Sequence, residues 1–291
     1  MSSRQSAQKT LSNEPTTGPD RIEQAGPEAG HSRHDALPSR LLSVDVHAYA
    51  LYLDCDGTLL DIAPTPNEVR VPPGLVSLLE RISTGLNGAL AIVTGRQLAE
   101  IDTLLAPARF VGAGVHGGEL RNFAGGAIAR VASSLPASLL DTVMRRVQKL
   151  PGIIAEPKGP GLAVHYRQAQ HLRDPLEAEL RAVLSQYGDE LILSHGRKLF
   201  EIIPAGHSKG TALEAIAELP MFTGRRPIMI GDDEGDLPAF AAAQRLGGNA
   251  MRVGGEQFGS YDVDFLGPAS VIAWLEELAR RLEAPRGGVS G

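Results

Sequence analysis

The sequence predicts an α/β protein whose core is a Rossmann-like parallel sheet, interrupted by an inserted α+β domain. Short apolar runs near residues 48–53, 89–93 and 227–230 alternate with helix-forming segments, as in βαβ units. Polar residues follow each run directly, as they do at the carboxyl ends of parallel strands. Between residues 115 and 202 the alternation gives way to mixed strand and helix patterns, which indicates a separate insert.

The composition is that of an ordinary globular protein, with 291 residues, 43% of them hydrophobic and 21% charged. A net charge of −6 and an aromatic content of 4% argue against a nucleic-acid-binding surface. No stretch has the apolar length of a membrane helix, and the single cysteine, Cys55, allows no internal disulfide. We therefore expect a soluble, cytoplasmic protein with no nucleic-acid or membrane partner.

Three regions follow from these patterns. Residues 1–44 are rich in Ser, Gln, Glu, Gly and Pro with little apolar periodicity, which predicts a disordered N-terminal tail. Residues 45–114 and 203–291 form the predicted α/β core, and residues 115–202 form the predicted insert. Helices are expected over residues 72–82, 97–105, 137–150, 172–187, 208–219, 236–243 and 269–282, and further strands over residues 110–111, 161–167, 198–203 and 249–253.

The most informative stretch is the end of the first strand, Leu53-Asp54-Cys55-Asp56-Gly57. Two aspartates one residue apart repel each other unless a cation or a proton separates their charges. A plain turn rich in aspartate would also explain the pair. An EF-hand calcium loop counted from Asp54 does not fit, because Leu59 and Thr65 stand where that loop needs glycine and glutamate.

The predicted core contains three other polar clusters: Thr94-Gly95-Arg96 after the second apolar run, Lys209 at a helix start, and Gly231-Asp232-Asp233 with Asp236 after the third run. A parallel sheet brings its strand ends to one edge. Carboxylates from two strand ends suit a hard cation such as Mg²⁺. A hydroxyl, loop N–H groups and an ammonium suit the oxygens of a phosphoryl group. Together the clusters indicate phosphate chemistry.

In this order the clusters resemble the four motifs of the haloacid dehalogenase superfamily, over about residues 48–114 and 203–283. The resemblance implies a hydrolase core in which Asp54 is the nucleophile that forms an aspartyl-phosphate and Asp56 is the general acid and base. It implies that Thr94 and Lys209 hold the phosphoryl group. It also implies a Mg²⁺ cofactor bound by Asp54, by Asp56 through its carbonyl, and by Asp232, with Asp233 and Asp236 supporting the site.

The insert is similar to the cap of the trehalose-6-phosphate phosphatases in four pieces, at residues 114–119, 156–159, 163–167 and 196–204. The resemblance implies hydrolysis of trehalose 6-phosphate, hence a role in trehalose biosynthesis, and it leaves room for a functional link to a trehalose-phosphate synthase. It implies that the Glu156 and Lys158 pair reaches sugar hydroxyls. The substrate-binding residues that it implies are Gly95, Arg96, His116, Glu119, Glu156, Lys158 and Arg167.

The sequence departs from that family after Gly-Asp-Asp-x, where the family usually has Thr-Asp-Glu and this chain has Gly235, Asp236 and Leu237. The same core chemistry would serve another sugar phosphate, such as sucrose 6-phosphate or mannosyl-3-phosphoglycerate, or a mutase or phosphotransferase. An alternative from another class is a non-catalytic sugar-phosphate sensor or an inactive partner of a synthase. The intact acidic residues argue against that alternative. On charge pattern alone, Glu156 and Lys158 would be a surface ion pair.

Overall fold

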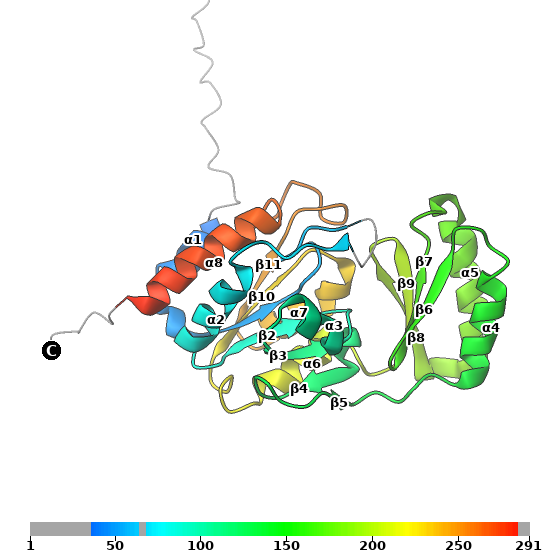
Figure 1. Cartoon of the computed structure of the whole chain (residues 1–291), viewed down its shortest axis with the longest axis horizontal. Coiled ribbons are helices and arrows are strands. Elements are labelled where there is room, and N and C mark those ends of the chain that lie inside the picture. The colour runs from blue at the N-terminus through cyan, green and yellow to red at the C-terminus, as the bar shows by residue number, and fades with distance from the viewer. Residues whose placement is uncertain (1–35, 64–67, 285–291) are drawn as a thin grey trace, which may run out of the picture. The chain divides into compact units, whose positions relative to one another are not determined.

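The structure, a computed structural model, describes residues 36–63 and 68–284 and contains two separate β-sheets (Figure 1). The predicted tail over residues 1–35 lies outside the described residues. Each sheet has its own cluster of buried apolar side chains. Within the described part of the chain, no helix has the length and apolar character needed to cross a membrane.

The larger sheet has seven strands in the order β11-β10-β1-β2-β3-β4-β5. Its first five members pair in parallel, whereas β4 and β5 are antiparallel additions at one edge. All five residues of β1 are buried because helices cover both faces of the sheet. The strands are β1 (Tyr49–Leu53), β2 (Leu90–Val93), β3 (Val111–Gly114), β4 (Glu119–Arg121), β5 (Ala129–Arg130), β10 (Arg226–Gly231) and β11 (Asn249–Arg252).

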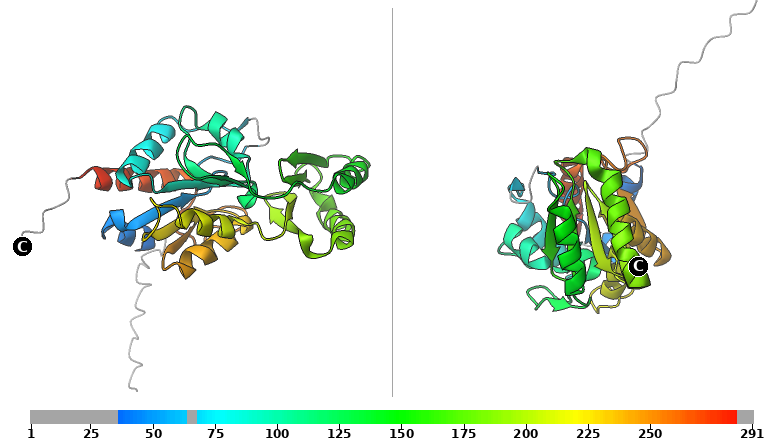
Figure 2. Two further views of the ribbon diagram at one scale, coloured as in Figure 1. Left: turned by 90° about the horizontal axis from the view of Figure 1, so that it is seen from below. Right: turned by 90° about the vertical axis from the view of Figure 1, so that its right-hand side faces the viewer.

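Helices α2 (Leu75–Gly85) and α8 (Pro268–Glu283) pack together on one face of this sheet (Figure 2). Helices α6 (Lys209–Ala217) and α7 (Leu237–Arg245) pack together on the other face. Helix α3 (Leu98–Leu104) connects β2 to β3. Short 3₁₀ turns complete the core at η2 (Val46–Ala48), η4 (Val115–Gly117) and η7 (Glu234–Asp236). The predicted alternation of strands and helices, and with it the α/β fold class, is confirmed.

The smaller sheet is fully antiparallel, in the order β6-β7-β9-β8. Its strands are β6 (Ile154–Lys158), β7 (Gly161–His165), β8 (Leu191–Gly196) and β9 (Leu199–Pro204). Helices α4 (Ala137–Val147) and α5 (Arg173–Leu184) bury one of its faces, and two 3₁₀ turns, η5 (Gln170–Leu172) and η6 (Ser185–Glu190), flank α5. The alternation of strand side chains therefore leaves polar residues on the opposite face.

Two boundaries differ from the sequence prediction. The tail was expected to extend to residue 44, yet residues Ala36–Leu42 form helix α1, in which Leu41 is buried. The indole Nε1 of Trp274 donates to Pro38 O at 2.9 Å, so a contact distant in sequence holds this helix. The insert was expected to begin at residue 115, yet β4 and β5 pair with β3 and belong to the core sheet.

Candidate active site

The predicted acidic residues meet at the carboxyl edge of the parallel sheet. Asp54 follows β1, Thr94 follows β2 and Asp232 follows β10, and these three strands are neighbours. All three side chains are buried. Gly57 has φ +82°, and a Cβ on it would lie 2.0 Å from Asp232 Oδ2. This close approach requires glycine at position 57, because any side chain would displace the Asp232 carboxylate.

Lys209 links two of the acids from the first turn of α6. Ser208 caps this helix by accepting from Thr211 N, which fixes the position of the lysine. The ammonium of Lys209 donates to Asp54 Oδ1 and to Asp236 Oδ1, each at 2.6 Å. Burial opposes the charged form of Lys209, but Asp236 and Asp54 hold its pKa well above the usual range. The lysine is therefore a fixed cation beside Asp54.

Both carboxylate oxygens of Asp236 accept hydrogen bonds in this network. Its Oδ1 accepts from Lys209, and its Oδ2 accepts from the backbone N–H groups of Asp232 and Asp233, each at 3.0 Å. A carboxylate with these bonds orders the loop after β10 and positions the lysine. Asp233 accepts from Gly235 N at 3.3 Å and caps the η7 turn.

The donor set fits a hard cation. Oxygen atoms of Asp54, Asp232 and Asp236 all lie within 4.8 Å of one another. Asp232 Oδ1 is buried and has no hydrogen-bond partner among the described residues. Burial raises the pKa of Asp54 to about 7 and that of Asp232 to about 9. Because the oxygens of Asp236 are already bound, Asp54 and Asp232 are the side chains available to hold Mg²⁺.

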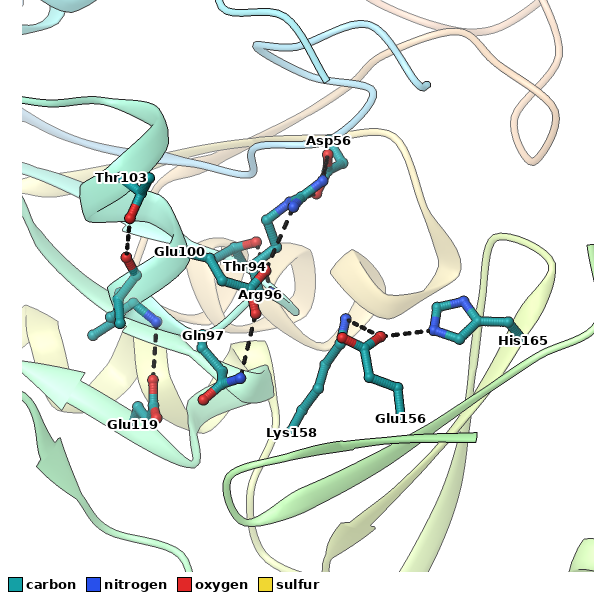
Figure 3. A network of polar contacts seen from close by, with 12 residues as sticks. Asp56, Thr94, Arg96, Gln97, Glu100, Thr103, Glu119, Glu156, Lys158 and His165 are labelled. Carbon is teal, nitrogen blue, oxygen red and sulfur yellow. Dashed lines mark hydrogen bonds and ion pairs between the residues drawn. The ribbon is translucent and has the colours of Figure 1, made fainter. Parts of the chain in front are cut away.

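The carboxylate of Asp56 is bound by Arg96 (Figure 3). Arg96 Nε donates to Asp56 Oδ2 at 2.6 Å, and Arg96 Nη2 donates to Asp56 Oδ1 at 2.8 Å. Arg96 was predicted from the sequence as a substrate-binding residue, without this bidentate partner. Thr94 Oγ1 accepts from Arg96 N at 3.1 Å, which anchors the same turn. Gly95 gives room to His116, since a Cβ there would lie 2.8 Å from His116 Nε2.

A cavity of about 570 Å³ lies between the acidic cluster and the polar face of the smaller sheet. This volume is within the range of about 300–1,000 Å³ that is common for small-molecule sites. The predicted site residues that line it are Asp54, Asp56, Thr94, Gly95, Arg96, His116, Glu156, Lys158, Arg167, Asp232 and Asp233. Arg167 also donates to Ala63 O in the segment after β1.

The strand β6 presents Glu156 and Lys158 side by side to this cavity (Figure 3). Lys158 Nζ lies 3.6 Å from Glu156 Oε2, and His165 Nε2 lies 3.0 Å from the same oxygen. The hydrogen bond from His165 and the charge of Lys158 hold the pKa of Glu156 below its usual range, although burial opposes them. Lys158 is 9% exposed whereas the side chain of Glu156 is 41% exposed, so the lysine end of this pair is buried and the carboxylate end is open to the cavity.

Glu119 does not line the cavity, contrary to its predicted substrate-binding role. Its Oε2 accepts from Leu98 N, the first residue of α3, at 2.9 Å. The N-cap residue of α3, Gln97, makes no side-chain cap bond. Glu119 therefore satisfies a free N–H group at the start of this helix.

The cavity-lining residues that were not predicted as site residues include two charged ones, Arg197 and Glu201. Glu201 lies on β9, is buried, and accepts a hydrogen bond from His116 Nε2. Burial opposes the charged form of Glu201, but His116 holds its pKa below the usual range. A glutamate inside the apolar run Leu199-Phe200-Glu201-Ile202-Ile203 is a signal that could have identified this position.

Sequence comparisons identify one family. The sequence model of the trehalose-phosphatase family matches residues 52–262. A probable trehalose-phosphate phosphatase of Sinorhizobium fredii is 41% identical over 214 residues, covering 73% of this chain and 80% of the relative. A trehalose-6-phosphate phosphatase of Escherichia coli is 36% identical over 240 residues, covering 82% of this chain and 89% of the relative.

Solved structures agree with this result at the level of the fold. The C-terminal domain of Candida albicans trehalose-6-phosphate phosphatase superposes with a TM-score of 0.71 at 20% identity, covering 84% of this chain and 98% of that chain. A phosphatase of the HAD enzyme superfamily from Bacteroides thetaiotaomicron gives a TM-score of 0.52 at 20% identity, covering 80% and 96%. This chain belongs to the trehalose-phosphatase family, a family of phosphoric monoester hydrolases with the haloacid dehalogenase fold.

Proposed function

We propose that this chain is a Mg²⁺-dependent phosphatase that hydrolyses trehalose 6-phosphate to trehalose and phosphate through an aspartyl-phosphate on Asp54. One observation carries the proposal. Asp54, which Lys209 binds, and Asp232 line the same cavity as Glu156 and Lys158 of the smaller sheet. Phosphate chemistry and polyol recognition are thereby combined in one cavity. The names of the Sinorhizobium and Escherichia relatives support the substrate.

The first half of the reaction uses Asp54 and Asp56. A carboxylate oxygen of Asp54 attacks phosphorus, and the bond between phosphorus and the sugar oxygen breaks with its electron pair moving to that oxygen. Asp56 in its acid form donates a proton to the same oxygen and releases the sugar as an alcohol. Since Asp56 is bound by Arg96 in this structure, the pair has to open before the proton moves.

The second half returns the enzyme to its starting state. The Asp56 carboxylate takes a proton from water, and the water oxygen attacks phosphorus. The bond between phosphorus and Asp54 breaks, which yields phosphate and a free Asp54 carboxylate. Lys209, which binds Asp54, balances the charge of the transferred group, and Thr94, which lines the cavity, holds one of its oxygens.

The bound cation supplies charge neutralisation, so that an anionic nucleophile can approach an anionic phosphate. Asp54 and Asp232 are the side chains proposed to hold it, together with the backbone carbonyl of Asp56. Glu156 and Lys158 offer an acceptor and a donor to sugar hydroxyls. A functional link to a trehalose-phosphate synthase and a cytoplasmic location remain predictions.

The test is phosphate release with Mg²⁺ from a panel of trehalose 6-phosphate, sucrose 6-phosphate, glucose 6-phosphate and mannosyl-3-phosphoglycerate. We expect a strong preference for trehalose 6-phosphate. A preference for another ester would retain the core chemistry and reject the sugar assignment. No release from any ester would favour the sensor alternative.

A further inference from the structure

A group of charged side chains outside the motif residues connects the turn between β8 and β9 to the loop that follows β11. Glu256 Oε2 accepts from Arg197 Nε at 3.1 Å, and Glu256 Oε1 lies 2.9 Å from Lys198 Nζ. Arg197 and Lys198 are the two residues between the strands. We call these contacts the Glu256 bridge. The bridge joins the smaller sheet to the core beside the cavity.

Both sides of the bridge are held in place by backbone hydrogen bonds. On the smaller sheet, Gly196 pairs with Leu199 across the turn, and Tyr166 N donates to Lys198 O at 3.0 Å. On the core loop, Gly255 and Gly259 exchange N–H···O bonds of 3.1 and 2.9 Å. Because both segments are already ordered, the ion pairs form at a small additional entropic cost.

The bridge also fixes the direction of the Arg197 side chain. Arg197 lines the cavity, whereas Glu256 does not. With its Nε bound by Glu256, the guanidinium directs Nη1 toward Asp232 Oδ2, 3.9 Å away. Gly255 lies beside this contact, since a Cβ there would be in ordinary van der Waals contact with Arg197 Nη1 at 3.8 Å and with Asp232 Oδ2 at 3.9 Å. An arginine without this anchor would sample several rotamers.

We propose that Glu256 is a positioning residue that holds the Arg197 guanidinium over the acidic cluster and thereby completes the phosphate-binding end of the cavity before the substrate binds. The proposal rests on the proposed function, because it assumes that a phosphate ester occupies this cavity. Because Glu256 does not line the cavity, its effect on the substrate acts through Arg197. A preorganised cation lowers KM more than it raises kcat.

The test compares the full chain with Glu256→Gln and with the control Glu214→Gln. Glu214 is a matched control because it also pairs with an arginine, Arg245, and its side chain is 41% exposed against 46% for Glu256. For Glu256→Gln we expect KM for trehalose 6-phosphate to rise about three- to tenfold with kcat within about twofold. Since exposed ion pairs are screened by salt, the difference in KM should shrink in about 0.5 M sodium chloride.

Hydrogen exchange without substrate gives a readout that does not depend on activity. Amides at residues 196–199 and 254–259 should exchange faster in Glu256→Gln than in the wild type and in Glu214→Gln. Wild-type KM in Glu256→Gln, with or without faster exchange, would overturn the positioning role. Unchanged exchange in Glu256→Gln would show that Glu256 does not order these two segments. Failure of the wild type to release phosphate from any sugar ester is a different result, which would reject the proposed function.

Discussion

Lys209 neutralises two buried carboxylates, Asp54 and Asp236, and all three side chains are at most 6% exposed. Replacing it by methionine would leave both acids without their cation in a buried site. We therefore expect Lys209→Met without Mg²⁺ to lower the free energy of unfolding by about 3–5 kcal/mol. Urea denaturation at neutral pH measures this, and Lys149→Met, at an exposed position, is the control. A loss below about 1 kcal/mol would contradict the role of Lys209 as a buried counter-ion.

The role of Asp54 as the nucleophile can be tested directly by substitution. Asparagine has nearly the same shape but is a far weaker nucleophile, so Asp54→Asn should lower kcat by at least about a thousandfold. The fold should persist, because the substitution also removes a buried charge; circular dichroism and thermal unfolding check this. Normal turnover by a folded Asp54→Asn variant would refute the nucleophile assignment.

At the residue level, the sequence predicted the acids that follow apolar strands, because strand ends of a parallel sheet converge. It did not reveal the pairing of Asp56 with Arg96, since that contact depends on how two neighbouring loops turn. It also did not reveal the bond from Leu98 N to Glu119, because that contact forms only once β4, which carries Glu119, pairs with β3. Arg197 was not predicted, because the sequence of the two-residue turn between β8 and β9 does not show that this turn lies next to Asp232 and Glu256.

The departure from the family motif at position 237, leucine in place of glutamate, lies at the start of helix α7. Leu237 is its first residue and is 42% exposed, and Leu246 at its other end is 41% exposed. A glutamate at position 237 would interact favourably with the positive end of the helix dipole. We expect Leu237→Glu to raise the free energy of unfolding by about 0.3–1 kcal/mol and Leu246→Glu to lower it. Equal effects of both substitutions in urea denaturation would contradict this explanation.

The elements that were predicted well are those with buried, continuous apolar patterns, such as β1, β2 and β10. Strands β6 and β8 were not assigned, because both lie at the edges of the smaller sheet and are only partly buried. Apolar and polar residues do not alternate regularly along these two strands, so the sequence pattern alone does not distinguish them from loops. Helix α1 was missed since it is short and depends on its contact with α8.

For the whole molecule, the buried acids make stability depend on pH and on Mg²⁺. Burial raises the pKa of Asp54 from 3.8 to about 7 and that of Asp232 from 3.8 to about 9. The folded chain thus retains protons that the unfolded chain releases, so metal-free stability falls as pH rises from about 4 toward 9. Bound Mg²⁺ favours the ionised acids and offsets this loss.

The increase in Tm on adding Mg²⁺ should therefore be several degrees larger near pH 8 than near pH 5.5. Thermal unfolding with Mg²⁺ and with EDTA measures the difference. Asp232→Asn should abolish most of it. An increase in Tm that is the same at both pH values would show that the cation binds elsewhere.

In the proposed function, the smaller sheet selects the sugar while the core performs the phosphate chemistry. The most direct measurement is kcat/KM for trehalose 6-phosphate and for p-nitrophenyl phosphate in the wild type, Lys158→Met and the exposed control Lys149→Met. Loss of a charged hydrogen-bond donor should lower kcat/KM for trehalose 6-phosphate by about a hundredfold in Lys158→Met, with a far smaller loss for the aryl ester. Equal losses for both esters would contradict the claim.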